Sequence, residues 1–110
     1  MITEYRRYRC APDDAPDLEH RFRHLAAPLF AAHGFRVAGA WTPARTGAAG
    51  DFLYAVHWSD TQAMAEGWQR FRDDPAWQRG RRHPRYERLR PEITSTAWRP
   101  ADFLGPAGRR

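Results

Sequence analysis

Three polar side chains alternate along a segment near the start of the chain. Glu4, Arg6 and Tyr8 are each separated by one residue, in a segment rich in Tyr and β-branched residues. Because side chains of a strand alternate between its two faces, all three project to the same face. A carboxylate, a guanidinium and a phenol in a row can hold an anionic substrate and transfer a proton. The alternative is a structural Glu–Arg pair at the sheet, which perturbs pKa values without catalysing a reaction.

Two histidines are further candidates for proton transfer. His33 ends an apolar helical stripe beside Gly34, so it is either a general base facing the sheet or a capping residue at the helix C-terminus. His57 lies in a strand, and we expect it on a face of small side chains that borders a cavity under the helices. The small residues expected on this face are Ala38, Ala40, Ser95 and Ala97. If His57 instead faces a partner sheet, it is an interface residue.

Metal and cofactor chemistry has little support in the sequence. His20 and His24 lie one helical turn apart, a spacing that can bind a metal, but no clear third ligand accompanies them. A single cysteine, Cys10, excludes an intrachain disulfide and a cysteine metal cluster. Haem ligation by one histidine has no positive support. We therefore expect no metal and no cofactor.

A set of aromatic residues forms the candidate wall of a pocket for a planar ligand. Small residues such as Gly39, Ala55 and Gly67 supply the gaps that such a pocket needs. The alternative for each aromatic residue is ordinary core packing. The set consists of Trp41, Tyr54, Trp58, Trp68 and Phe71.

The charge of the chain comes from arginine alone. All 18 basic residues are Arg, the net charge is +5 and the isoelectric point is about 10.3. Such a value favours nucleic-acid binding, but no groove-reading helix or aromatic platform accompanies it, so we expect no nucleic-acid partner. A basic run is either a solvated surface or an anion gate near the pocket. It comprises Arg79, Arg81, Arg82, Arg85, Arg88 and Arg90.

The order of predicted elements defines the fold class. Apolar residues recur every three or four positions from Leu18 to Leu29, which predicts a helix over residues 16–33 that ends at Gly34. Pro28 lies inside this helix and predicts a kink or a local widening. A second helix carries Met64, Trp68 and Phe71, and Asp74 caps a short third one. With strands over residues 2–9, 35–43, 51–58 and 92–98, the order is βαββαβ, an α+β ferredoxin-like protomer with a four-stranded antiparallel sheet.

The size of the chain and its apolar surface predict its assembly. A chain of 110 residues is one domain, here residues 1–104 followed by a flexible tail at 105–110. The helices cover one face of the sheet, and the Val and aromatic residues of the other face predict a homodimer joined sheet to sheet. No apolar run approaches the roughly 18 residues of a membrane span, and no signal-peptide pattern begins the chain. We expect a cytoplasmic protein without a membrane partner.

Short motifs occur in a fixed order along nearly the whole chain. They are Ile2-x-Glu4-x-Arg6-x-Tyr8, Pro28-Leu29-Phe30-x-x-His33-Gly34-Phe35, Gly39-x-Trp41, Trp58, Trp68-x-x-Phe71, Asp74-Pro75-x-Trp77 and Arg99-Pro100-x-Asp102-Phe103. In this order they resemble the NIPSNAP family of the dimeric α/β-barrel superfamily. The sequence departs from the family pattern at His57, where a small apolar residue is usual, and between Gln78 and Pro91, where the segment is more basic.

The resemblance implies a fold more than a reaction. It implies a ferredoxin-like protomer that dimerises through its sheets, with a pocket between helices and sheet. Relatives in the superfamily include cofactor-free monooxygenases, polyketide cyclases, isomerases and haem-binding enzymes, and the fold does not decide among them. Our first hypothesis is a cofactor-free enzyme that acts by proton transfer on an aromatic or polyketide-like anion. The alternatives are a non-catalytic ligand-binding or scaffold dimer and an arginine-mediated nucleic-acid binder.

Overall fold

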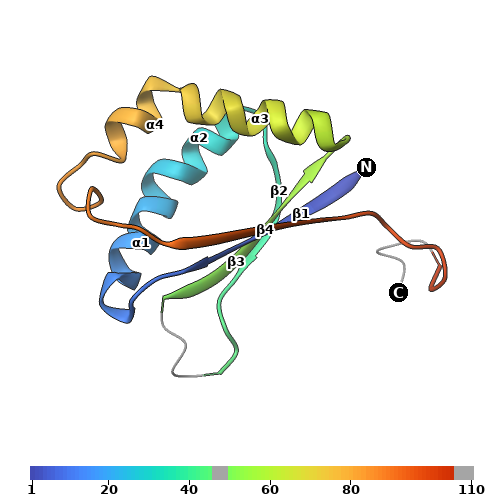
Figure 1. The fold of residues 1–110 in the computed structure, drawn as a ribbon, viewed down its shortest axis with the longest axis horizontal. Coiled ribbons are helices and arrows are strands. Elements are labelled where there is room, and N and C mark those ends of the chain that lie inside the picture. The colour runs from blue at the N-terminus through green and yellow to red at the C-terminus, as the bar shows by residue number, and fades with distance from the viewer. Residues whose placement is uncertain (46–49, 106–110) are drawn as a thin grey trace.

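A computed structural model describes residues 1–45 and 50–105 of the chain. Four strands form one antiparallel sheet in the order β2-β3-β1-β4, and the helices all lie on one side of it (Figure 1). This is the predicted α+β ferredoxin-like fold. Most of the predicted 45–50 loop and of the 105–110 tail falls outside the described residues. The elements are β1 (Ile2–Arg9), η1 (Pro12–Asp14), α1 (Ala15–Arg21), η2 (Phe22–Ala26), α2 (Ala27–Ala32), β2 (Arg36–Trp41), β3 (Asp51–Trp58), α3 (Thr61–Asp73), α4 (Pro75–Gly80) and β4 (Glu92–Trp98).

The first helical region is continuous but changes its winding before Pro28. Segment η2, between α1 and α2, is π-helical, and the amide of Ala27 donates to the carbonyl of Phe22, five residues earlier. Pro28 has no amide to donate to the carbonyl of His24, so the turn before it widens. The predicted widening is therefore confirmed. Gly34 then ends the helix with a φ of 74°, a left-handed conformation that suits glycine.

Aspartate side chains start the last two helices. Asp60 Oδ1 accepts a hydrogen bond from the amide of Ala63 at 2.7 Å and begins α3. Asp74 Oδ1 accepts from the amide of Ala76 at 2.8 Å and begins α4, with Pro75 in the first helical turn. These bonds satisfy amides that have no partner inside the helix. The side chain of Asp74 also connects α4 to the end of α2, as described below.

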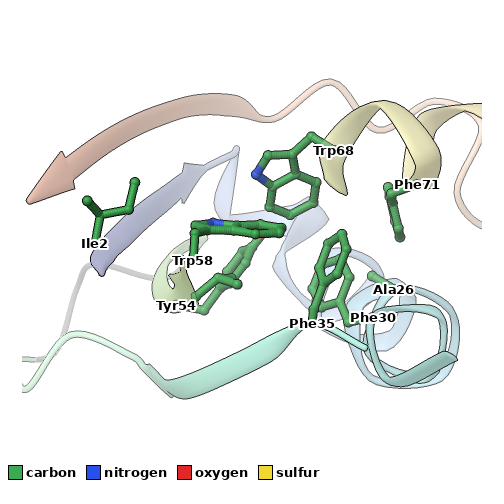
Figure 2. Close-up of a cluster of buried hydrophobic side chains, with 9 residues drawn as sticks. Ile2, Ala26, Phe30, Phe35, Tyr54, Trp58, Trp68 and Phe71 are labelled. Atoms are coloured by element: carbon green, nitrogen blue, oxygen red, sulfur yellow. The ribbon is translucent and has the colours of Figure 1, made fainter. Parts of the chain in front are cut away.

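An aromatic core fills the space between the helices and one face of the sheet. Strand β3 contributes its even-numbered side chains, and α3 contributes Trp68 and Phe71 (Figure 2). Phe30 of α2 lies among them, with its ring 5.1 Å from that of Phe71 and 5.6 Å from that of Trp68. The buried members are Ile2, Ala26, Phe30, Phe35, Tyr54, Val56, Trp58, Trp68 and Phe71.

The opposite face of the sheet has no helical layer in the part of the chain that the structure describes. Tyr5 of β1 and Trp98 of β4 are 37% and 61% exposed, respectively. None of the described helices is long and apolar enough to cross a membrane.

Candidate functional site

A buried carboxylate lies at the centre of the candidate site. Glu4 of β1 is only 1% exposed, and its Oε1 accepts hydrogen bonds from the indole Nε1 atoms of Trp58 and Trp68, at 2.9 and 2.7 Å. Its Oε2 accepts from Ser95 Oγ of β4 at 2.5 Å and from Arg6 Nη1 at 3.4 Å. Each oxygen thus has two donors, which fix the position of the carboxyl group. Glu4 is therefore placed to hold its neighbours rather than to take a proton from a substrate.

Arg6 connects this carboxylate to two phenols. Its Nε donates to the hydroxyl of Tyr54 at 2.9 Å, and its guanidinium lies 4.2 Å above the ring of Trp68. The hydroxyl of Tyr8 lies 3.4 Å from that of Tyr54 and ends the chain of contacts. The four residues Glu4, Arg6, Tyr54 and Tyr8 are called the polar network below.

Burial and charge set the protonation states in the polar network. Burial lowers the pKa of Arg6, but the phenols of Tyr54 and Tyr8 and the carboxylate of Glu4 outweigh it and raise this pKa. Burial also raises the pKa of Tyr54 well above that of a free tyrosine, and the Tyr8 phenol raises it further. At neutral pH Arg6 is therefore a cation and Tyr54 a neutral phenol. The Arg6 side chain is 18% exposed and that of Glu4 2%, so Arg6 reaches the surface and the carboxylate does not.

A second guanidinium approaches the network from α1, and the sequence analysis missed it. Arg21 is only 8% exposed, and its guanidinium lies 5.5 Å from the ring of Trp77. Burial lowers the pKa of Arg21, while the Tyr8 phenol acts on it in the opposite sense. Within residues 1–45 and 50–105, its guanidinium makes no ion pair and no side-chain hydrogen bond. The sequence did contain a signal for the burial of Arg21. This residue follows Leu18 by three positions and precedes Leu25 by four, so it lies on the apolar stripe of the helix.

His57 is on the other face of the sheet, so its predicted placement under the helices was wrong. The register of β1 and β3 pairs Arg6 with Tyr54 and Thr3 with His57, and strand alternation separates the two pairs. His57 Nδ1 lies 2.9 Å from Thr3 Oγ1 on that far face. It does not join the polar network.

Three of the small residues that we expected beside His57 lie instead on the opposite face of the sheet, which carries Glu4. Ser95 and Ala97 of β4 pair with Arg6 and Glu4, respectively. Ala40 of β2 pairs with Tyr54, because an irregularity between Val37 and Gly39 shifts the register of this strand. The register shift places Ala40 on the same face as Tyr54, and the regular pairing of β4 places Ser95 and Ala97 there.

His33 connects two helices rather than the helices and the sheet. Its Nε2 lies 2.8 Å from Asp74 Oδ2, so the end of α2 is attached to the start of α4. The amide of Ala76 lowers the pKa of Asp74 most, and the bond from His33 lowers it further. His33 therefore has the capping and packing position that was the alternative to a general base.

The candidate aromatic wall divides into two groups. Tyr54, Trp58, Trp68 and Phe71 are buried in the core, whereas Trp41 is exposed and lines a hollow of about 820 Å³. This hollow lies between the first helical region and the ends of β2 and β3. Its lining residues are Ala15, Leu18, Glu19, Phe22, Arg23, Ala27, Ala40, Trp41, Thr42, Pro43, Arg45, Gly50, Asp51 and Phe52.

The hollow and the polar network do not coincide, but they share an aromatic wall. The ring of Phe52 lies 4.9 Å from that of Tyr8, and the ring of Phe22 lies 5.0 Å from that of Tyr54. The charged residues Asp51 and Glu19 at the rim are already paired with Arg7 and Arg23. The hollow therefore offers mostly apolar surface, and the polar groups lie in the network beside it.

The paired histidines of α1 and η2 have a tyrosine as their partner. His20 Nδ1 lies 2.5 Å from the Tyr86 hydroxyl, and the rings of His20 and His24 are 4.2 Å apart. Among the residues that the structure describes, no three His, Cys, Asp or Glu side chains are grouped so as to hold a metal ion.

Comparison with known proteins identifies the family. The NIPSNAP family model matches residues 3–104. The chain belongs to the NIPSNAP family. No curated protein matches this NIPSNAP chain.

Solved structures similar to this NIPSNAP chain include other family members. An uncharacterised NIPSNAP domain protein from Burkholderia xenovorans is 23% identical, with a TM-score of 0.76 over 94% of this chain and 97% of that one. A NIPSNAP family protein from Agrobacterium tumefaciens is 20% identical, with a TM-score of 0.79 over 96% and 97%. A protein from Deinococcus radiodurans described as a putative antibiotic biosynthesis monooxygenase is 16% identical, with a TM-score of 0.59 over 98% and 100%. At these identities the likeness establishes the fold alone.

Proposed function

We propose that this NIPSNAP chain binds an aromatic or polyketide-like anion beside Arg6, Arg21 and Tyr8. The observation that carries the proposal is Arg21, a residue only 8% exposed whose guanidinium has no acidic partner in the described residues and whose unpaired nitrogens therefore reach the surface. A buried charge is costly unless it is paired, and Glu4 already pairs with Arg6. An anionic ligand would supply the missing partner.

The surroundings of the two guanidinium groups indicate the class of ligand. Guanidinium donors form a planar fork that matches a carboxylate or an enolate. Arg6 lies over the indole of Trp68 and Arg21 beside that of Trp77, and the aromatic wall of Phe22 and Phe52 continues into the hollow. A flat, largely apolar molecule with one negative group fits this combination.

We further propose cofactor-independent proton transfer as an isomerase, cyclase or monooxygenase-like reaction. Tyr8 is the outermost phenol of the network, and it is the group that would exchange a proton with a bound enol or enolate. The two guanidinium groups would stabilise the negative charge that develops on the oxygen of the ligand. Glu4 acts through Arg6 and is a positioning residue. The solved relative described as a putative antibiotic biosynthesis monooxygenase has the same fold, which is compatible with such chemistry.

A matched pair of ligands tests the anion site. We expect 1-naphthoate to bind, with quenching of Trp fluorescence, and the neutral 1-naphthamide to bind at least tenfold more weakly. Arg21→Met should weaken 1-naphthoate binding roughly 10- to 100-fold, because a hydrogen bond to a charged group contributes about 1.5–3 kcal/mol. Binding of 1-naphthamide should change little.

Arg70→Met is the control for this experiment. Arg70 is exposed on α3 and does not line the hollow. This variant should bind 1-naphthoate as the wild type does. Equal affinity of the two ligands, or unchanged 1-naphthoate binding by a folded Arg21→Met variant, would overturn the proposal.

Non-catalytic ligand binding is the second candidate, because the four donors around Glu4 make the network well suited to hold an anion in place. A catalytic site and a purely binding site differ in whether they accelerate the exchange of carbon-bound hydrogen of a ligand with solvent. A catalytic site would incorporate solvent deuterium at the carbon next to the carbonyl of a bound 1,3-diketone, and Tyr8→Phe would abolish the incorporation. A purely binding site would leave the rate of exchange at its solution value.

We propose that the chain forms a homodimer through the sheet face that carries Tyr5 and Trp98. Both aromatic side chains are exposed on this face, which has no helical layer in the described residues. Light scattering at micromolar concentration should give twice the chain mass of 12.8 kDa. A Tyr5→Glu/Trp98→Glu variant should shift the mass to that of a monomer. A monomeric wild-type protein would contradict the proposed homodimer, in which the two sheets pack face to face.

A further inference from the structure

A second hollow, of about 540 Å³, lies where α4 and the segment after it pack against η2. Gly80 and Leu25 are in close contact there, because a Cβ atom at Gly80 would lie 2.5 Å from Leu25 Cδ1. None of the residues of the polar network lines this hollow, which we call the α4 groove. Its lining residues are His24, Leu25, Ala76, Arg79, Gly80, Arg82, His83 and Tyr86.

The charges of the α4 groove have one sign. Its ionisable side chains are two arginines, two histidines and a tyrosine, and no carboxylate lines it. Within residues 1–45 and 50–105, neither Arg79 nor Arg82 makes an ion pair or a side-chain hydrogen bond. The two guanidinium groups therefore keep their donors free for a ligand.

The arginines at the end of the arginine-rich segment differ from these two residues, because each of them has a partner. Arg85 and Arg88 donate to Asp17 at 2.6 and 2.5 Å, and Arg88 also contacts Asp14. Arg90 donates to the backbone carbonyls of Glu87 and Leu89. Arg81 makes no ion pair in the described residues either, but it does not line the groove, so the groove holds two of the three unpaired arginines of residues 79–82.

The imidazoles of the groove add positioned donors. His83 Nδ1 accepts a hydrogen bond from the amide of Arg85 at 3.1 Å, so the neutral ring carries its proton on Nε2 and can donate it. The hydroxyl of Tyr86 is hydrogen-bonded to His20, and the ring of His20 packs against that of His24. The arginine and imidazole donors come from η2, α4 and the segment after α4.

We propose that the α4 groove binds the phosphate group of a phosphorylated small molecule. A phosphate offers several acceptor oxygens, and two guanidinium groups and an imidazole N–H supply complementary donors. A nucleic acid is a worse match, because its backbone needs a continuous track of free cations and the neighbouring arginines are neutralised by Asp14 and Asp17. This site is separate from the polar network and does not depend on the proposed function of that network.

Titration of the full chain with inorganic pyrophosphate tests the proposal at constant ionic strength. We expect saturable binding by calorimetry, with shifts of the imidazole ¹⁵N resonances of His24 and His83 and no shift for His33 and His57. Arg79→Gln/Arg82→Gln should weaken binding at least tenfold. Arg36→Gln/Arg99→Gln removes the same charge from exposed positions that do not line the groove, and it should bind as the wild type does.

Two other anions separate phosphate recognition from general attraction. Malonate carries two carboxylates and should bind at least tenfold more weakly than pyrophosphate. A 20-base-pair DNA duplex should not displace pyrophosphate at physiological salt. Equal loss of affinity in the two double variants, shifts spread over all the histidines, or preference for malonate or DNA would each overturn the proposal.

Discussion

Replacement of Glu4 by alanine is expected to lower the free energy of unfolding by about 3–5 kcal/mol, the usual cost of breaking a buried ion pair by removal of one partner. The variant loses the acceptor of two indole N–H groups, one hydroxyl and the Arg6 guanidinium. The indoles of Trp58 and Trp68 are buried, so water cannot replace the carboxylate as their partner. Arg6 would also lose the carboxylate that positions its guanidinium beside Tyr54.

Urea denaturation followed by circular dichroism measures this effect at a fixed protein concentration. Glu66→Ala is the matched control, because Glu66 is exposed on α3 and accepts only from Gln62, so its loss should stay within about 0.5 kcal/mol. Glu4→Gln keeps the shape of the side chain and should fall between the two. A Glu4→Ala variant as stable as the control would contradict the central role of this carboxylate.

Gly67→Ala is expected to cost about 1–3 kcal/mol, the usual range for overpacking a tight core. An added Cβ at Gly67 would lie 2.4 and 2.6 Å from ring atoms of Trp58, well inside van der Waals contact. The indole cannot rotate away freely, because its Nε1 is bonded to Glu4 and its ring packs against those of Phe35 and Trp68. The substitution therefore also disturbs the polar network, and Trp fluorescence should report the movement of the ring.

Gly80→Ala is the comparison for this prediction. Its Cβ would meet Leu25 at 2.5 Å, but the contact is with the end of a flexible side chain that is only partly buried. Leu25 can adopt another rotamer at a cost of order 1 kcal/mol or less, and alanine favours the helix. We expect a smaller loss than at Gly67. A Gly67→Ala variant at least as stable as the wild type would show that the contact of α3 with β3 relaxes without cost.

The sequence by itself determined the elements and their order, and it placed most of their ends within one or two residues. Periodicity of apolar residues indicated the order of strands and helices, because 3.6-residue and 2-residue repeats are local properties. Pro28, Gly34 and Asp74 determined a widened turn, a helix end and a helix start through their own backbone chemistry. Strand alternation likewise placed Glu4, Arg6 and Tyr8 on one face before any tertiary contact was known.

Only the tertiary structure decided which residues meet on the functional face. Alternation says that His57 and Tyr54 lie on opposite faces, but only the packing of helical residues such as Phe30 and Trp68 against the Tyr54 side shows which face the helices cover. The irregularity in β2 reversed the parity of Ala40, which no local pattern announced. Arg21 approaches Tyr8 because the chain turns back after β1 and α1 packs over the sheet, where Tyr8 also packs against the apolar cluster that includes Leu18. Register and helix packing join segments that are distant along the chain, and their free energy depends on which side chains fill the same space rather than on any residue's own preference.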